Sequence, residues 1–238
     1  MNTLSEKGEG SEILTYNIGH LNQCAAFGSA YMGSVQYYAA MLATQQPVVH
    51  AAQTSLTRLW AHNHCRICGA NGVQQLVVPV EKTNYLATTP MRDVVISEHG
   101  NWRHQHWGAL FSSYGKSPFF DYIADDLQRT ICGSQRFLLD FNMQLHQLVV
   151  DFLDLPIHCT ATDTLPPHAA DLRRAVGEKK PSGNMVHNVP YYQLWAERFG
   201  FVPDLSIIDL LCNTGREAVF TLIDMARGQQ SEREIYNE

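Results

Sequence analysis

The order of strand-like and helix-like segments along this chain restricts its fold more than any other feature. Short apolar segments typical of strands come early, at residues 25–30, 48–49, 65–67, 76–80 and 94–97. An early helix is expected at 34–44, and after Asn101 apolar residues recur at helical spacing over 102–113, 118–131 and 136–153. We therefore expect an α+β fold: a small N-terminal mixed sheet with a hairpin, followed by a mainly helical C-terminal half, in one compact unit.

Turn and loop patterns place the remaining boundaries. The hairpin is expected at Gly69-Ala70-Asn71-Gly72, because Asn-Gly tolerates the positive φ of a tight turn. Residues 160–190, rich in Pro, Thr, Asp, Lys and Gly, are expected to form a long surface loop. Helices follow at 191–199 and 207–213, the second capped by Asp204 or Ser206. We expect a loose extension over 1–24, one folded domain over 25–227 and a charged tail over 228–238.

Composition excludes several classes of partner. The net charge is −6 and no basic stripe is present, which argues against nucleic-acid binding. No run of about 18 apolar residues occurs, so no membrane span is expected. The first residues lack the basic start and apolar run of a signal peptide. The six cysteines are scattered, and without an export signal we expect mostly reduced thiols and a cytoplasmic location.

Two groups of metal-binding residue types are present, but neither predicts a metal site. Cys65-x-x-Cys68 follows His62 and His64 like a zinc half-site, yet no second Cys-x-x-Cys exists, and a strand would direct the two thiols to opposite faces. We therefore favour a structural role. His104 and His106 diverge on a helix, so no shared metal is expected. His106 alone as a general base is the alternative to a surface histidine.

A helix start in the middle of the chain carries an unexpected cation. Arg103 lies in the first turn of the predicted helix, where the helix dipole disfavours positive charge. Its partner is expected to be an anion, either a protein carboxylate or a ligand phosphate, and Lys116 would add a point charge. Trp102 would stack on a sugar or base. A core tryptophan beside a structural ion pair explains the same residues equally well.

The C-terminal region carries a carboxylate within an apolar run. Asp209 and Asn213 are four residues apart, on one helix face, in a segment that is expected to be buried. A buried carboxylate needs partners, and Arg103 is one candidate. Tyr191, Tyr192 and Gln193 lie shortly before this helix. A ligand site and a structural polar tether between the two halves of the chain both fit this pattern.

Several of these motifs, in this order, resemble the WbqC-like family over roughly residues 25–225. The resemblance rests on Ser34-Val35-Gln36-Tyr37-Tyr38, the hairpin at 65–72, residues 101–107, Tyr114-x-Lys116-x-Pro118-Phe119-Phe120, 191–193, 197–201 and 204–213. The chain departs from the family at His62-Asn63-His64, where many members carry Arg-Asn-Arg. The resemblance implies bacterial surface-polysaccharide biosynthesis, such as that of O-antigen, with acyl, aminoacyl or glycosyl transfer onto a sugar. It supplies no catalytic residue to carry over.

The leading functional expectation is a transferase acting on a small activated sugar or amino sugar, without a cofactor. Arg103 and Lys116 would hold a phosphate or carboxylate, and the aromatic side chains of Trp102, Tyr191 and Tyr192 would border the sugar. Asp209 or His106 would accept the acceptor's proton, with Gln193 and Asn213 orienting polar groups. No serine or cysteine elbow indicates a covalent nucleophile. A non-catalytic sugar-nucleotide binding or scaffold protein is the alternative, and a metal-dependent hydrolase is a weaker one.

Overall fold

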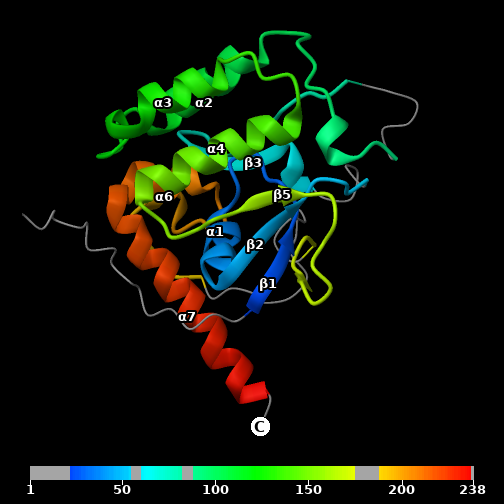
Figure 1. Ribbon diagram of the computed structural model, residues 1–238. Coiled ribbons are helices and arrows are strands. Elements are labelled where there is room, and N and C mark those ends of the chain that lie inside the picture. The colour runs from blue at the N-terminus through cyan, green and yellow to red at the C-terminus, as the bar shows by residue number, and fades with distance from the viewer. Residues whose placement is uncertain (1–21, 55–59, 82–87, 175–187, 237–238) are drawn as a thin grey trace, which may run out of the picture.

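The computed structural model describes residues 22–54, 60–81, 88–174 and 188–236 (Figure 1). The strands are β1 (Asn22–Phe27), β2 (Thr44–His50), β3 (His64–Gly69), β4 (Gly72–Val77), β5 (Thr160–Thr162) and β6 (Ala170–Asp171). The α-helices are α1 (Val35–Leu42), α2 (Trp102–Tyr114), α3 (Asp121–Ile131), α4 (Leu138–Leu153), α5 (Ala196–Phe199), α6 (Ile207–Thr214) and α7 (Ala218–Tyr236). Short 3-10 helices lie at η1 (Trp60–His62), η2 (Met91–Asp93) and η3 (Gly215–Glu217).

The main sheet is parallel and is built around the first two strands. Its order is β5-β2-β1-β6, and every neighbouring pair runs in the same direction. The helix α1 connects β1 to β2, which is the kind of crossover that parallel strands require. The predicted α+β class is confirmed, with an N-terminal sheet and helices in the later half. Among the described strands, the antiparallel ladder is the separate β3-β4 hairpin, and the other antiparallel pairings are isolated bridges.

Two strands lie within the segment that was predicted to be a surface loop. β5 pairs with β2 and β6 pairs with β1, so residues 160–162 and 170–171 complete the sheet. The loop prediction is wrong there because strands of three and two residues show no detectable alternation. Their stabilisation comes from hydrogen bonds to strands distant in sequence. Residues 175–187 of the predicted loop lie outside the described residues.

The predicted hairpin is confirmed. β3 and β4 pair in antiparallel register with Gly69 opposite Gly72, and the φ angle of Gly72 is 96°, which favours glycine. The predicted strand at 94–97 is not a ladder strand. Val95 and Ile96 each form one isolated bridge, with Phe137 and Val80 respectively.

The helical half largely follows the predicted spacing. α2, α4 and α6 lie where the apolar stripes indicate, whereas α3 starts at Asp121 and α5 spans only four residues. Helix α7 was not predicted and includes most of the expected charged tail. Of the predicted extension over 1–24, residues 1–21 lie outside the described residues and 22–24 belong to β1. The domain boundaries at 25 and 227 stay predictions.

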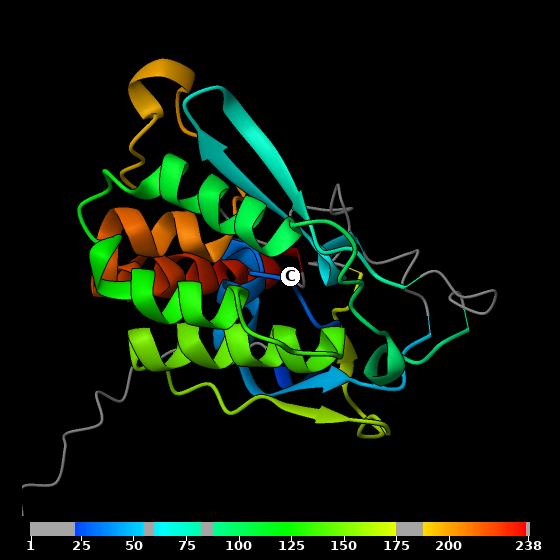
Figure 2. The same cartoon turned by 90° about the horizontal axis from the view of Figure 1, so that it is seen from above.

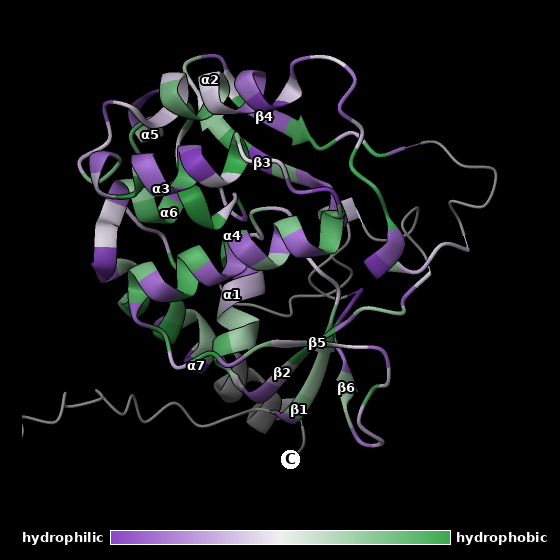
Figure 3. Cartoon of the chain, turned by 45° about the horizontal axis from the view of Figure 1, so that its top comes forward, coloured by the Kyte–Doolittle hydropathy of each residue, from purple (hydrophilic) through white to green (hydrophobic). Residues whose placement is uncertain are grey.

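The core lies between the sheet and the helical layer. Figure 3 shows α2, α3, α4 and α6 gathered on one side of the molecule, with α1 between them and the parallel strands. Fully buried side chains from both halves fill this space, including Phe27, Tyr38, Met41, Leu138 and Leu211. Among the described residues, no helix is both long and apolar enough to cross a membrane.

Candidate functional site

The predicted C-terminal polar residues meet around one buried carboxylate. Asp209, in the first turn of α6, is 1% exposed, and its Oδ2 accepts hydrogen bonds from the hydroxyl of Tyr191 at 2.7 Å and from Nε2 of Gln193 at 3.1 Å. Asn213 lies one turn later. Its side chain donates to the carbonyl of Asp209 at 2.8 Å and accepts from the backbone N–H of Leu194 at 3.0 Å. The structure therefore places Tyr191, Gln193, Asp209 and Asn213 in one hydrogen-bonded cluster.

Burial dominates the electrostatics of this carboxylate. Desolvation raises the pKa of Asp209 to about 6, against the hydrogen bonds from Tyr191, Tyr114, Gln193 and Asn213, which lower it. Tyr114, at the end of α2, is a partner that the sequence analysis missed, and its hydroxyl also accepts from the N–H of Cys68 at 3.2 Å. These bonds attach the segment at 191–194 to α6.

Removing the Asp209 carboxylate should destabilise the fold. Asp209→Ala leaves buried donors from Tyr191, Tyr114 and Gln193 without an acceptor, at a cost of about 3 kcal/mol in the free energy of unfolding. Urea unfolding at pH 7.5 measures this loss. The same substitution at Asp224, an exposed position of α7, is the matched control and should have little effect. Equal effects at the two positions would mean that the network is not formed.

Arg103 and Trp102 belong to the core rather than to an open site. The Arg103 guanidinium donates to Glu98 at 2.9 and 3.3 Å and to the carbonyls of Ile131 and Gln135 at 2.9 and 3.1 Å. Trp102 is 5% exposed, with its Nε1 bonded to the carbonyl of Ser97 at 3.0 Å. The anion that Arg103 needs is therefore Glu98, and not Asp209, which was the candidate partner.

The remaining predicted residues are dispersed. His106 is 5% exposed, its Nδ1 is 2.7 Å from the hydroxyl of Tyr31, and burial lowers its pKa to about 4. Because it is buried, it is not the surface histidine that was the alternative to catalysis. Lys116 and Tyr192 are exposed, and no contact links either of them to Asp209 among the described residues. The structure thus places the proposed phosphate-binding and acid–base residues in separate environments.

A small hollow lies where two helix starts meet. Ser34 and Ser206, the N-caps of α1 and α6, form an isolated bridge, and the N–H of Val35 bonds to the carbonyl of Leu205 at 2.9 Å. The cavity beside them has a volume of about 20 Å³. Its lining residues come from the loop before α1, from η1, from β3 and from the segment before α6: Met32, Gly33, Ser34, Trp60, Ala61, His64, Cys65, Arg66, Asp204 and Ser206. We refer to it as the Asp204 hollow.

The carboxylate of Asp204 is one of the groups that line this hollow. Its Oδ1 atom is buried and has no hydrogen-bond partner among the described residues. Desolvation raises the pKa of Asp204, while a hydrogen bond with Ser34 and the charge of Arg66 lower it. Asp204 also lies close enough to raise the pKa of Tyr191, so the hollow borders the Asp209 network.

Cationic and aromatic side chains complete the lining. Arg66 donates through Nη2 to the carbonyls of Pro203 and Asp204, at 2.9 and 3.1 Å. The ring of His64 stacks on Trp60 with centroids 5.2 Å apart. Asp204 and Met32 both have positive φ angles, 54° and 43°, which are costly for residues other than glycine. Such strain concentrates at functional sites.

The sequence analysis identified few of the residues that line this hollow. Asp204 was considered only as a helix cap, a role that Ser206 performs by accepting from the N–H of Ile208. The unusual His62-Asn63-His64 was noted, and His64 does line the hollow. His62 instead is buried beside the segment that follows β1, with its Nδ1 2.6 Å from the carbonyl of Ser29. A bridge between residues 34 and 206 leaves no local pattern in the sequence.

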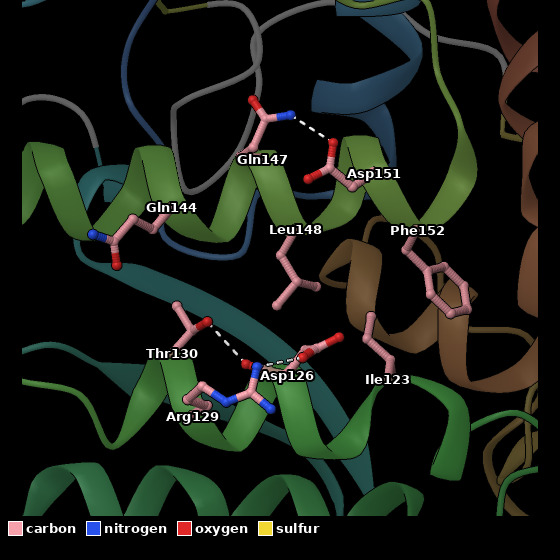
Figure 4. Close-up of a pocket in the computed structure, with 9 residues that line it drawn as sticks. All are labelled: Ile123, Asp126, Arg129, Thr130, Gln144, Gln147, Leu148, Asp151 and Phe152. Atoms are coloured by element: carbon pink, nitrogen blue, oxygen red, sulfur yellow. Dashed lines mark hydrogen bonds and ion pairs between the residues drawn. The ribbon is translucent and has the colours of Figure 1, made fainter.

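A larger groove lies between α3 and α4, but no predicted site residue lines it. Its volume is about 570 Å³. Figure 4 shows Gln144, Leu148 and Phe152 pointing from α4 toward α3. The polar groups at its rim largely pair with one another, such as Arg129 with Asp126 at 2.7 Å and Gln147 with Asp151 at 2.7 Å. Most polar groups at its rim are therefore engaged within the protein.

The described residues contain no cluster of three or more His, Cys, Asp or Glu side chains that would hold a metal ion. All six cysteines are free thiols.

Comparison with known proteins identifies the family. The fold and the hollow define an α+β protein with a polar site at the start of α6. The family model described as "WbqC-like protein family" matches residues 29–183, and the chain belongs to this family. The match includes Trp60, His64 and Arg66, whereas Asp204 and Asp209 lie beyond it. No curated protein and no solved structure matches the chain.

Proposed function

We propose that this chain is a transferase that modifies an activated sugar at the Asp204 hollow. The observation that carries the proposal is the buried, unpartnered Oδ1 of Asp204 beside the guanidinium of Arg66. A carboxylate with a raised pKa and a free oxygen is suited to general base catalysis, because its basicity is brought nearer to neutral pH. Membership of the WbqC-like family supports a substrate from surface-polysaccharide biosynthesis.

The size of the hollow decides which part of the substrates enters it. A volume of about 20 Å³ admits one small polar group, such as the amine or hydroxyl of the acceptor. The body of each substrate would lie outside, over the neighbouring surface of Trp60 and His64. The Arg66 guanidinium would bind the phosphate of the activated donor, since guanidinium groups match phosphate geometry.

The proposed step is a general-base-assisted displacement. The acceptor nitrogen or oxygen attacks the acyl, aminoacyl or glycosyl carbon of the donor. The new C–N or C–O bond forms as the bond to the phosphate-bearing leaving group breaks. The leaving group departs with the electron pair toward Arg66, and the acceptor proton passes to Oδ1 of Asp204. Asp209 and Tyr191 would keep the segment before α6 in place, which makes them positioning residues.

This proposal assigns the proton acceptor to Asp204 in place of His106 or Asp209. His106 bonds to Tyr31 and Asp209 bonds to Tyr191 and Gln193, so both groups already have side-chain partners. A base must reach the proton that it removes. Asp204 is the carboxylate in this region with an oxygen that no described residue occupies.

Binding without catalysis is the second candidate function. It is favoured by the internal pairing of Arg103, His106 and Asp209. Because each of these side chains bonds to another protein side chain, none of them is free to act on a substrate outside the hollow. In that case the chain would be a sugar-nucleotide binding or scaffold protein, and ligand would bind with no product formed.

A nucleotide-sugar panel tests the proposal. We expect at least one member to raise the melting temperature, because a ligand that binds only the folded state stabilises it. The hit is then supplied with amino and hydroxyl acceptors, and product is followed by mass spectrometry. Asp204→Asn, which tolerates the left-handed backbone, should keep binding and lose roughly 100-fold in turnover. Asp125→Asn, at an exposed position of α3, is the matched control. Binding without any product supports the second candidate, and full turnover by Asp204→Asn contradicts the assigned base.

A further inference from the structure

The carboxyl ends of the parallel strands meet at one edge of the main sheet. β1 lies between β2 and β6, and β5 pairs with the other side of β2. In Figure 2 the arrows of β2, in blue, and β5, in yellow-green, lie side by side and point the same way. Because all four strands run in one direction, the side chains at their carboxyl ends can contact one another across this edge.

A chain of polar contacts runs along this edge. His50 is the last residue of β2, and its Nε2 lies 3.2 Å from the carbonyl of Asp163, which follows β5. On the other side, its Nδ1 lies 2.8 Å from Nη1 of Arg173, which follows β6. Because β1 separates β2 from β6, the Arg173 side chain spans the carboxyl end of β1. Gly28, the residue directly after β1, adds no side chain that would obstruct it.

The contact with Arg173 determines the protonation state of the imidazole. A guanidinium group has N–H donors and no acceptor, so His50 can bond to it only through an unprotonated Nδ1. The proton of the neutral ring then lies on Nε2, which donates to the carbonyl of Asp163. A second proton on the ring would bring two donors and two positive charges face to face. The contact therefore requires a neutral His50.

The other charged groups at this edge keep Arg173 with β6 when that contact is lost. Arg173 donates to the Asp171 carboxylate through Nε and Nη2, at 2.8 and 2.6 Å, and both residues belong to the same short segment. In the described part of the chain, the charged side chains around His50 and its partners are Arg92, Asp93, Asp163, Asp171 and Arg173. The bond from Arg173 to His50 is thus the side-chain contact that crosses from β6 to β2.

Few backbone bonds hold β6 to the sheet. The strand has two residues, which pair with Ala25 and Ala26 of β1. The N–H of Leu172 extends the pairing by donating to the carbonyl of Ala26 at 2.9 Å. Segments with so few contacts open locally at a low cost in free energy. The charge-assisted bond to His50 should therefore have a measurable effect on how often β6 opens.

We propose that Arg173 and His50 form a pH-sensitive strap that holds β6 against the sheet. Imidazole is the side chain that ordinarily takes up a proton between about pH 8 and 5, and protonated His50 then releases Arg173 together with Asp171. β6 separates from β1 more often as a result. The contacts between β5 and β2 stay in place, because Nε2 keeps its proton. The inference does not depend on the proposed function.

Amide hydrogen exchange of the full chain, followed by NMR, tests the strap with an internal reference. The Leu172 N–H reports on β6, and the Ala51 N–H, which donates to the carbonyl of Thr162 at 2.8 Å, reports on β5. After correction for the intrinsic pH dependence of exchange, protection at Leu172 should fall roughly 3-fold between pH 8 and pH 6. Protection at Ala51 should stay nearly constant. An equal fall at both amides would mean that the whole fold loosens, and it would overturn the proposal.

Two variants separate the titration from the contact. The side chain in His50→Gln can accept from Arg173 and donate to Asp163, but it takes up no proton, so Leu172 should stay protected at both pH values. Arg173→Met removes the strap, so Leu172 should exchange faster at pH 8 and show no further dependence on pH. Arg92→Met removes an exposed ion pair at the same edge and is the matched control, which should keep the wild-type pH response.

The tautomer of His50 provides a second measurement that needs no variant. Nitrogen NMR of the imidazole should show the proton on Nε2 at pH 8, as the donors of Arg173 require. A proton on Nδ1 at that pH would exclude the contact and overturn the proposal. A pH response of Leu172 that persists in His50→Gln would equally overturn it, because another group would then control the opening of β6.

Discussion

Lowering the pH from 6.5 to 4 is expected to remove much of the folding free energy of this protein. His62, His106 and His146 are buried, and desolvation lowers the pKa of each imidazole from 6.5 to about 4. Between these pH values the unfolded chain binds protons that the folded chain does not. Stability is therefore complete above pH 6.5 and is lost as the pH falls toward 4.

The size of this effect follows from the pKa differences. One pKa unit corresponds to about 1.4 kcal/mol, so each histidine costs about 3 kcal/mol at pH 4. Asp209 acts in the opposite direction. Its pKa is raised from 3.8 to about 6, so the folded form takes up a proton first and gains about 3 kcal/mol as the pH falls. A net loss of about 6 kcal/mol is comparable with the whole stability of a typical domain.

Urea unfolding at a series of pH values measures this dependence, and one variant isolates a single histidine. His146 has an Nδ1 without a partner, and its ring stacks on Tyr38, so His146→Phe keeps the stacking and removes one titration. The dependence of the unfolding free energy on pH should fall by about a third to a half. His104→Phe, at an exposed position of α2, is the matched control. A wild-type free energy that stays constant between pH 7 and pH 4.5 would show that these imidazoles are not buried.

The second large effect is expected at Arg103. Arg103→Met leaves the carbonyls of Ile131 and Gln135 without their donor and removes a cation from above the Trp102 ring, where it lies 4.5 Å from the centroid. We expect a loss of about 3 kcal/mol in the free energy of unfolding. Glu98 adds little to this loss, because its side chain is 65% exposed and stays solvated.

Two further variants separate structural loss from functional loss. Arg103→Lys keeps the charge but not the forked geometry, so its stability should lie between those of Arg103→Met and the wild type. Arg129→Met removes an exposed ion pair on α3 and should cost less than about 1 kcal/mol. If Arg103→Met were as stable as the wild type and instead failed to bind ligand, Arg103 would be a substrate-binding residue and the structural assignment would be incorrect.

The parts of the fold that could be predicted are those with a local cause. The Gly69-Ala70-Asn71-Gly72 turn fixes the hairpin, the helical spacing of buried residues marks α2 and α4, and the apolar run of α6 is buried on all sides. Strands β5 and β6 could not be predicted, because their few residues are ordered by pairing with β2 and β1. Helix α7 did have a local pattern, with buried Val219, Leu222, Ile223 and Ala226 at helical spacing, and it was overlooked.

The candidate site also has residues with a local sequence pattern and residues that are brought together only by the fold. Asp209 and Asn213 were found because a carboxylate in an apolar helix must meet partners, and the four-residue spacing put the amide beside it. Arg103 was correctly expected to have an anionic partner, but sequence cannot tell a protein carboxylate from a ligand. Asp204 gains its importance from the bridge between Ser34 and Ser206, which brings together residues that are far apart in the chain.

The location of the ligand site is tested most directly by comparing two cations. Calorimetric titration with the best nucleotide-sugar is carried out on the wild type, Arg66→Gln and Lys116→Gln. A charge-assisted hydrogen bond contributes about 2 kcal/mol, so Arg66→Gln should weaken binding roughly 30-fold. Lys116, exposed at the end of α2, should be replaceable with the affinity unchanged. Unchanged affinity in Arg66→Gln together with a large loss in Lys116→Gln would place the ligand away from the Asp204 hollow.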